Sequence, residues 1–268
     1  MAMQAEITME PITAGTFCWN ELAVRDTEKA SAFYTALFGW TSETSKEGPM
    51  PYTVFKMGEH PVGGMIQMDS NWPEDVPSHW GCYISTDDVD ATATRAVELG
   101  GTLCCEPQEA GEEGRFAVLQ DPAGAVVNVF KGGDGKNPKG HGSFCWNELL
   151  TTDMNKASDF YTGLFGWRAD SSRTSEEPYT VFMNGEEWAG GMMNMPCEGY
   201  PAWLSYISVA SVDETTSKAV LLGATVVAEP ADIPDIGRFS VFVDPVGATI
   251  AVFTGLSERC SDGCKCSS

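Results

Sequence analysis

The same six residues, Phe-Cys-Trp-Asn-Glu-Leu, occur at 17–22 and again at 144–149. Each copy carries one acidic side chain, Glu21 or Glu148, inside an otherwise mostly apolar segment. A carboxyl group in apolar surroundings has a raised pKa and can act as a general base. Glu21 and Glu148 are therefore the residues that we predict to be catalytic, if the protein is an enzyme.

The hexapeptide alternates in the way that is typical of a strand, where every second side chain points to the same face. Phe17 and Trp19 then share a face with the first glutamate, and Phe144 and Trp146 share one with the second. Aromatic walls around one acid suit a small, planar or cationic organic ligand. The same pattern is expected if the tryptophans simply fill the protein core.

A long internal repeat contains the hexapeptide. Matches between the copies run at an offset of 127 residues and later at 123, which one short deletion between about residues 66 and 80 explains. We therefore predict two tandem domains, 13–131 and 141–255. The residues between them, 132–140, are rich in glycine and charge and predict a flexible linker. The polar tail, 256–268, is predicted to be disordered, although its Cys260, Cys264 and Cys266 could hold a soft metal.

Each predicted domain divides again into two similar units. A strand is followed by a helix with apolar residues at helical spacing, and three further strands complete the unit. In the first unit Asp26 is the expected N-cap and Gly39 the expected terminator of the helix. The chain should thus hold four βαβββ units in two pairs. The expected strands and helices of the first domain are 17–24, 29–37, 41–45, 52–57, 61–68, 80–85, 89–99, 102–106, 115–120 and 125–130.

This plan resembles the vicinal oxygen chelate superfamily, which contains glyoxalase I, bleomycin-resistance proteins, fosfomycin-resistance proteins and extradiol dioxygenases. The residues that carry the resemblance are Asp26, Phe33-Tyr34, Leu37-Phe-Gly-Trp40, Asp87-Asp-Val-Asp90 and Asp121-Pro-Ala-Gly124, with their second-copy counterparts. The resemblance implies an α+β fold in which paired units curve into a mixed sheet around a cavity. Family members hold a divalent metal there, which polarises substrate oxygens. Function must still be argued from the site, since one fold hosts many chemistries.

The positions at which the family places its metal ligands can be counted from these landmarks. None of them is His, Glu or Asp, and only one carries even a weak donor. We therefore expect no metal at the standard positions and no other cofactor. The six positions are Trp19, Gly81 and Asn128 in the first copy and Trp146, Leu204 and Ala251 in the second.

A relocated metal site is the alternative. His79 lies two residues before Gly81, so on a strand it would point to the same face. Together with Glu21 and Asn128 it could hold a divalent metal in the first domain. The second copy has Ala202 at the position of His79, so only one half could do this.

The resemblance also implies which side chains face the cavity. Arg115 and Arg238 are ambiguous, because they could neutralise an anionic substrate, hold Glu21 and Glu148, or lie exposed on a strand. The predicted ligand-binding residues are Trp19, Tyr83, Asn128, Phe130 and Arg115 in the first domain, and Trp146, Tyr206, Phe253 and Arg238 in the second.

Charge limits the partners. The chain of 268 residues has 38 acidic and 16 basic side chains, a net charge of −22. Nucleic acid and anionic membrane surfaces need clustered Lys and Arg, so neither is an expected partner. No apolar run approaches the ~20 residues that span a bilayer, and the N-terminus lacks the pattern of a secretory signal, so we expect a cytoplasmic protein.

Three hypotheses follow. The protein could be a metal-free small-molecule binder, in the manner of the bleomycin-resistance proteins. It could be a glyoxalase-like lyase or a dioxygenase with a relocated metal. It could also be a structural protein whose cavities are filled by its own side chains. A monomer or a homodimer fits each of these.

Overall fold

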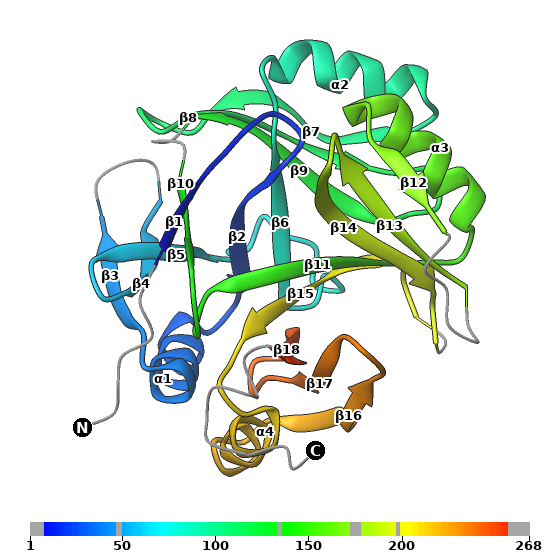
Figure 1. Cartoon of the computed structure of the whole chain (residues 1–268). Coiled ribbons are helices and arrows are strands. Elements are labelled where there is room, and N and C mark those ends of the chain that lie inside the picture. Colours follow the sequence, from blue (N-terminus) through cyan, green and yellow to red (C-terminus); the bar gives the residue numbers. More distant parts are fainter. Residues whose placement is uncertain (1–7, 47–49, 133–135, 172–177, 197–198, 257–268) are drawn as a thin grey trace.

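Two eight-stranded mixed sheets dominate the computed structural model, which describes residues 8–46, 50–132, 136–171, 178–196 and 199–256 (Figure 1). Each sheet is built from one copy of the repeat, so the sheets are formed within copies and not by exchange between them. In the first sheet the strand order is β3-β4-β5-β2-β6-β9-β8-β7. Its strands are β2 (Phe17–Val24), β3 (Thr41–Ser45), β4 (Tyr52–Met57), β5 (His60–Gln67), β6 (His79–Ser85), β7 (Thr102–Glu109), β8 (Gly114–Gln120) and β9 (Val126–Gly132).

The second sheet repeats this order as β12-β13-β14-β11-β15-β18-β17-β16. The two units of a copy join where their first strands pair antiparallel, β2 with β6 and β11 with β15. The predicted pairs of βαβββ units are thereby confirmed. The strands are β11 (Phe144–Thr151), β12 (Arg168–Asp170), β13 (Tyr179–Asn184), β14 (Glu187–Asn194), β15 (Ala202–Ser208), β16 (Thr225–Ile233), β17 (Gly237–Val243) and β18 (Thr249–Gly255).

The helices form where their caps and apolar spacing predict them: α1 (Thr27–Phe38), α2 (Val89–Glu98), α3 (Met154–Phe165) and α4 (Val212–Leu221). Asp26 caps α1 by accepting from the backbone N–H of Lys29 at 2.9 Å. Gly39 ends the helix at a φ of 73°, a left-handed conformation that glycine adopts without strain. Among these described residues no helix is long and apolar enough to cross a membrane.

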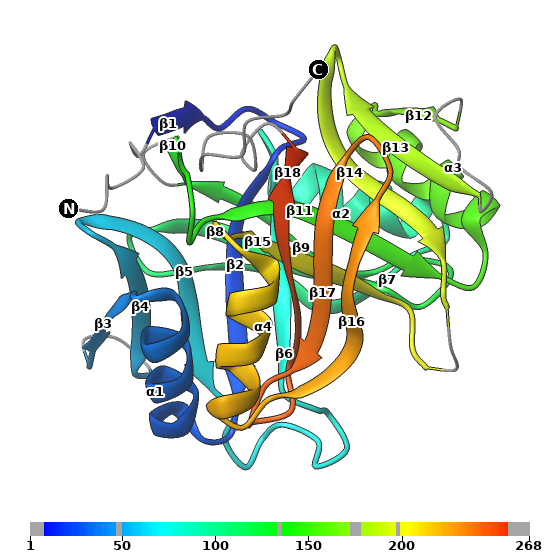
Figure 2. The same ribbon diagram turned by 60° about the horizontal axis from the view of Figure 1, so that its bottom comes forward.

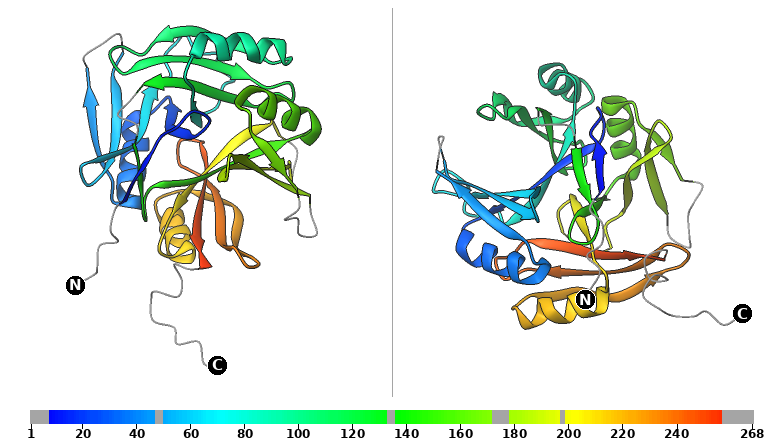
Figure 3. Two further views of the ribbon diagram at one scale, coloured as in Figure 1. Left: turned by 45° about the horizontal axis from the view of Figure 1, so that its top comes forward. Right: turned by 60° about the vertical axis from the view of Figure 1, so that its left-hand side comes forward.

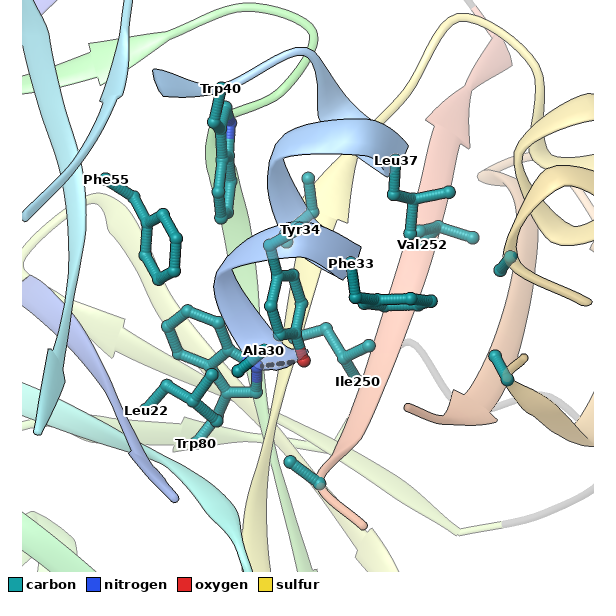
Figure 4. Close-up of a cluster of buried hydrophobic side chains, with 14 of the residues drawn as sticks. Leu22, Ala30, Phe33, Tyr34, Leu37, Trp40, Phe55, Trp80, Ile250 and Val252 are labelled. Atoms are coloured by element: carbon teal, nitrogen blue, oxygen red, sulfur yellow. Dashed lines mark hydrogen bonds between the residues drawn. The ribbon is translucent and has the colours of Figure 1, made fainter. Parts of the chain in front are cut away.

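The two copies pack back to back through these helices. The buried face of α1 contacts apolar residues of the other copy's β18, and α1 lies beside α4 (Figures 2 and 4). In Figure 4, Phe33 and Leu37 of α1 lie against Ile250 and Val252. On the other side of the molecule α2 lies beside α3 in a second shared cluster (Figure 3). Each copy therefore completes the hydrophobic core of the other.

Buried polar contacts fix the two copies in register. The Tyr34 hydroxyl donates to Asp244 Oδ2 at 2.6 Å and accepts from Trp80 Nε1 at 2.7 Å. Near the middle of the interface Asn20 Nδ2 donates to Asn147 Oδ1 at 3.2 Å and to Ser205 Oγ at 2.8 Å. Such satisfied buried groups favour one relative placement of the copies over alternatives.

The segment predicted as a flexible linker contains a strand. β10 (Lys136–Lys139) pairs antiparallel with β1 (Thr8–Pro11), and Asn137 Nδ2 donates to the carbonyl of Phe17 at 2.8 Å. Local composition does not reveal this strand, because its partner comes from the distant N-terminal segment. Residues 133–135 and the cysteine-containing tail lie outside the described residues.

Candidate functional site

Each sheet has one face against the helices and one face that carries no described helix. On the helix-free face of the first copy, Trp19 and Glu21 of β2 pair with Tyr83 and Gly81 of β6, and Tyr83 pairs in turn with Asn128 of β9. We call the side chains on this face the floor of the first domain. They are Trp19, Glu21, Tyr52, Gly81, Tyr83, Val118, Asn128 and Phe130; the floor of the second domain comprises Trp146, Glu148, Tyr179, Leu204, Tyr206, Val241, Ala251 and Phe253.

A hydrogen-bonded cluster surrounds Glu21. The Tyr83 hydroxyl donates to Glu21 Oε1 at 2.8 Å, and Trp19 Nε1 donates to the Tyr52 hydroxyl at 2.9 Å. Burial raises the pKa of Glu21, and hydrogen bonds from Tyr52 and Tyr83 partly oppose this by stabilising the carboxylate. The cluster therefore presents one carboxyl group whose proton affinity is increased by its surroundings.

The second copy rebuilds this cluster. The Tyr206 hydroxyl donates to Glu148 Oε1 at 2.9 Å, and Trp146 Nε1 donates to the Tyr179 hydroxyl at 3.1 Å. Burial again raises the pKa of Glu148, against hydrogen bonds from the two tyrosines. The predicted pairing of tryptophan and glutamate on one face is thus present in both copies.

The tyrosines in these clusters remain hydrogen-bond donors. Burial and the neighbouring Glu21 raise the pKa of Tyr52 and of Tyr83 far above the ordinary tyrosine range. Each hydroxyl therefore keeps its proton at neutral pH. The glutamate is the acidic group of the cluster, and burial moves its pKa upward, which is the direction that suits a general base.

Sequence reasoning missed Tyr52 and Tyr179, and also the glycines that they cover. A Cβ added at Gly64 would overlap the Tyr52 hydroxyl and lie 2.9 Å from Trp19 Nε1, and Gly191 stands in the same relation to Tyr179 and Trp146. The missing side chain lets the aromatic rings lie across the strand. A signal was present, because Pro-Tyr-Thr-Val-Phe and Gly-Gly-Met recur in both copies.

Phe17 and Phe144 were predicted on this face, and that was wrong. The register shifts between Phe17 and Trp19, so the two side chains do not alternate as in a regular strand. Phe17 instead contacts Trp203 of the other copy, with ring centroids 5.1 Å apart, and Phe144 contacts Trp80 at the same distance. Both phenylalanines belong to the interface between the copies.

Arg115 and Arg238 do not lie on the floors. In β8 it is Phe116 that pairs with Phe130, so alternation directs Arg115 to the helix side. There its guanidinium makes two hydrogen bonds with Asp90 of α2, at 2.7 and 2.8 Å, and Arg238 bonds Asp213 of α4 likewise. The prediction that these arginines bind ligand beside the glutamates is corrected by this placement.

The donor set at the standard metal positions does not fit a metal ion. Trp19 and Gly81 offer no side-chain ligand, and the amide nitrogen of Asn128 donates to the carbonyl of Cys82 at 3.1 Å. His79 Nδ1 lies 2.9 Å from the carbonyl of Pro77, and its ring faces Trp72. Within the described residues no group of three or more His, Cys, Asp or Glu side chains is placed to hold a metal ion.

Two surface hollows lie away from the floors. One, of about 430 Å³, is lined by residues of α1 and of the strands beside it, among them Thr35, Thr53 and Met65. The other, of about 330 Å³, lies between the start of α2 and Leu164 and Phe165 of α3. Neither hollow is lined by Trp19, Glu21 or their counterparts. The two hollows are therefore distinct from the floors.

Both copies match known domain families. The model described as "Glyoxalase-like domain" matches residues 19–130, and the model "Glyoxalase/Bleomycin resistance protein/Dioxygenase superfamily" matches residues 145–252. The chain is 35% identical over 250 residues to the "Putative glyoxylase CFP32" of Mycobacterium bovis, covering 89% of this chain and 94% of that protein. It is 31% identical over 261 residues to the "Anthracycline biosynthesis protein DnrV" of Streptomyces peucetius, covering 91% and 94%.

Solved structures share the arrangement of both copies. The Mn(II)-bound glyoxalase from Novosphingobium aromaticivorans superposes with a TM-score of 0.64 at 18% identity, over 90% of this chain and 82% of that one. The 2,3-dioxygenase LapB from Pseudomonas sp. KL28 gives 0.64 at 12% identity, over 92% and 94%. At such low identity the likeness concerns the fold alone. The chain belongs to the glyoxalase/bleomycin resistance protein/dioxygenase superfamily, also called the vicinal oxygen chelate superfamily, as two of its domains in tandem.

Proposed function

We propose that this protein binds a small organic molecule with planar rings on a helix-free face, without the metal site that is standard in its superfamily. One observation carries the proposal. At and around the standard ligand positions both copies place a tryptophan, a glutamate and two tyrosines joined by hydrogen bonds. Aromatic faces stack on planar ligands, and a carboxyl group between them orients a polar substituent.

Charge narrows the class of ligand. The floor of the first domain carries one acidic group, Glu21, while the nearby guanidinium of Arg115 is directed to the opposite side of the sheet. The chain as a whole has a net charge of −22. A neutral or cationic ligand therefore fits this face better than an anion, because a cation gains from both the carboxylate and the aromatic rings.

Two relatives support a polycyclic ligand. The proteins named DnrV and DauV, 31% and 32% identical to this chain, are both described as anthracycline biosynthesis proteins. Anthracyclines contain fused planar rings, the shape that an aromatic floor accommodates by stacking. We extend this only to the class of ligand, a fused-ring molecule.

Equilibrium dialysis with proflavine, a planar tricyclic cation, tests the proposal on the purified chain. We expect saturable binding, and at least tenfold weaker binding of anthraquinone-2-sulfonate, a planar anion of similar size. Metal analysis on protein prepared without chelator should find less than about 0.1 divalent metal ion per chain. Absence of saturable proflavine binding would overturn the proposal. A stoichiometric divalent metal would favour the relocated metal site instead.

A further inference from the structure

We propose that ligand binding is confined to the floor of the first domain, where Gly81 and Asn128 select planar ligands that carry amino or hydroxyl hydrogen-bond donors. This rests on the proposed function and deepens it. The floor of the second domain is filled by its own side chains. The argument compares equivalent residues of the two floors.

Three pairs of equivalent floor side chains differ in exposure. In the second domain Glu148, Tyr206 and Val241 are buried, with 8%, 6% and 8% of their surface exposed. Their counterparts in the first domain, Glu21, Tyr83 and Val118, are all partly exposed. The first floor is thus more accessible than the second at these three places.

Two substitutions between the copies account for this difference. Leu204 stands where the first copy has Gly81, and Ala251 where it has Asn128. Leu204 and Ala251 pack with Tyr206 and Val241 into one hydrophobic cluster, against which the partly buried Trp146, Phe239 and Phe253 also lie. The added leucine side chain supplies the atoms that a ligand would otherwise contribute, and apolar burial stabilises that filled state.

An additional tryptophan contacts the second floor. The ring of Trp188 lies edge-on to Trp146, with centroids 6.1 Å apart. The first copy has Pro61 at the equivalent position of β5. The indole of Trp146 thus contacts the ring of Trp188, whereas the equivalent neighbour of Trp19 is a proline.

Asn128 gives the first floor an unused acceptor. Its Nδ2 donates to the carbonyl of Cys82 at 3.1 Å, which orients the amide. Asn128 is buried, with 8% of its surface exposed, but its Oδ1 makes no hydrogen bond to a described residue and keeps some contact with solvent. Glycine at 81 permits this placement, because a Cβ there would lie 3.1 Å from Asn128 Nδ2.

The other polar groups of the first floor also present acceptors. The Trp19 N–H is donated to Tyr52, and the hydroxyl protons of Tyr52 and Tyr83 are engaged by Glu21. The oxygens of Glu21 and Asn128 remain available for further hydrogen bonds. A ligand that carries N–H or O–H groups at the edge of a planar ring satisfies these acceptors, whereas a ligand without donors leaves them unpaired.

Binding stoichiometry tests the inference directly. Isothermal titration of the full chain with proflavine, which bears two primary amino groups, should give one site per chain. Two equivalent sites would overturn the inference and leave the proposed function standing. No site would overturn the proposed function itself, so the two failures are distinguishable.

Variants then locate the site. Gly81→Leu combined with Asn128→Ala reproduces the second floor in the first domain and should abolish proflavine binding, while Leu204→Met in the second domain should leave affinity and stoichiometry unchanged. The double variant should keep cooperative thermal unfolding, since the second copy already accommodates this residue pair. Retention of the site in a folded double variant, or its loss in Leu204→Met, would contradict the assignment.

A ligand pair tests the selectivity without relying on a double substitution. Acridine orange has the proflavine ring and charge, but its amino groups are dimethylated and lack N–H donors. Asn128→Ala should weaken proflavine binding about fivefold, the effect of losing one hydrogen bond, and leave acridine orange binding unchanged. If the affinity for both dyes falls equally, or if neither affinity changes, Asn128 does not distinguish ligands by their hydrogen-bond donors.

Discussion

The two copies are more alike on one face of their sheets than on the other. On the helix side the copies are nearly interchangeable, for Trp80 bonds Tyr34 at 2.7 Å and Trp203 bonds Tyr161 at 2.8 Å. On the helix-free side they differ at the centre of the floor, where one copy has Gly81 and the other Leu204. The helix sides form two hydrophobic clusters, each shared by both copies, so a change in either copy disturbs both. The floors lack this mutual constraint and can diverge.

The shared core itself has one asymmetric contact. Asp244 Oδ2 accepts from the Tyr34 hydroxyl at 2.6 Å, whereas the contact of the equivalent Asp121 with the Tyr161 hydroxyl is weaker and is the smallest of the interactions that lower the pKa of Asp121. Asp121 still lies close enough to raise the pKa of the Tyr161 hydroxyl. The two halves of the interface should therefore contribute unequally to stability, which the following variants measure.

The largest effect is expected from opening a cavity in the shared core. Phe242 is fully buried, and its ring lies 6.4 Å from that of Phe33 in the other copy. Phe242→Ala should lower the free energy of unfolding by about 3–5 kcal/mol. Denaturant unfolding followed by tryptophan fluorescence should show one transition for both copies.

A surface substitution on the same copy is the matched control for that variant. Val227→Ala, at a side chain with 60% of its surface exposed, should change the unfolding free energy by less than about 0.5 kcal/mol. Two separate transitions in Phe242→Ala would show that the copies fold independently and that the shared core does not couple them.

Removing the two equivalent tyrosine hydroxyls should have unequal effects. Tyr34→Phe leaves both the Trp80 N–H and Asp244 Oδ2 without their partner, at a cost of about 3 kcal/mol. Tyr161→Phe leaves the Trp203 N–H unpaired and removes only a weaker contact with Asp121, so it should cost about 1–2 kcal/mol. Urea unfolding of both variants under one buffer measures the difference; equal losses would mean that the interface is symmetric in energy.

The floor glutamates should make the protein less stable as the pH rises. Burial raises the pKa of Glu148 in the folded state, so the folded chain binds this proton more tightly than the unfolded chain does. Stability therefore falls as the pH increases from the ordinary glutamate pKa of about 4.3 through the raised value. Glu148→Gln should flatten that decline in unfolding free energies measured between about pH 4 and pH 8.

Glu21→Gln gives the comparison between floors. It should flatten the decline as well, since burial also raises the pKa of Glu21. The effect should be similar in size, because burial raises the pKa of both glutamates against hydrogen bonds from two equivalent tyrosines. A decline that is unchanged in both variants would show that other carboxyl groups, such as the buried Asp121 and Asp244, dominate the pH dependence.

The smallest effect is expected from the arginines on the helix side. Arg115→Gln removes ion pairs with Asp90 and Glu109, at 2.7 and 2.8 Å, that are partly exposed to solvent and contribute little. Because Arg115 points away from the floor, proflavine affinity should change by less than about twofold in dialysis. A larger loss of proflavine affinity would show that Arg115 contributes to ligand binding.

Local sequence patterns predicted many of the helices and strands. Asp26, the spacing of Phe33, Tyr34 and Leu37, and Gly39 predicted α1 within two residues at its start and one at its end, because caps and helical periodicity act within a few residues. The internal repeat predicted the paired units for the same reason. The β-bulge before Trp19 and the pairing of β10 with β1 escaped prediction, since each depends on a strand far away in the chain.

The sequence by itself determined the duplication, the βαβββ units and the presence of Trp19 and Glu21 on one strand face. Only the tertiary structure decided that Tyr52 and Tyr83 form hydrogen bonds with that glutamate and that Arg115 bonds Asp90 instead. The physical reason is range. Periodicity and capping are set by neighbours along the chain, whereas the environment of a carboxyl group is set by strands that meet it across the sheet.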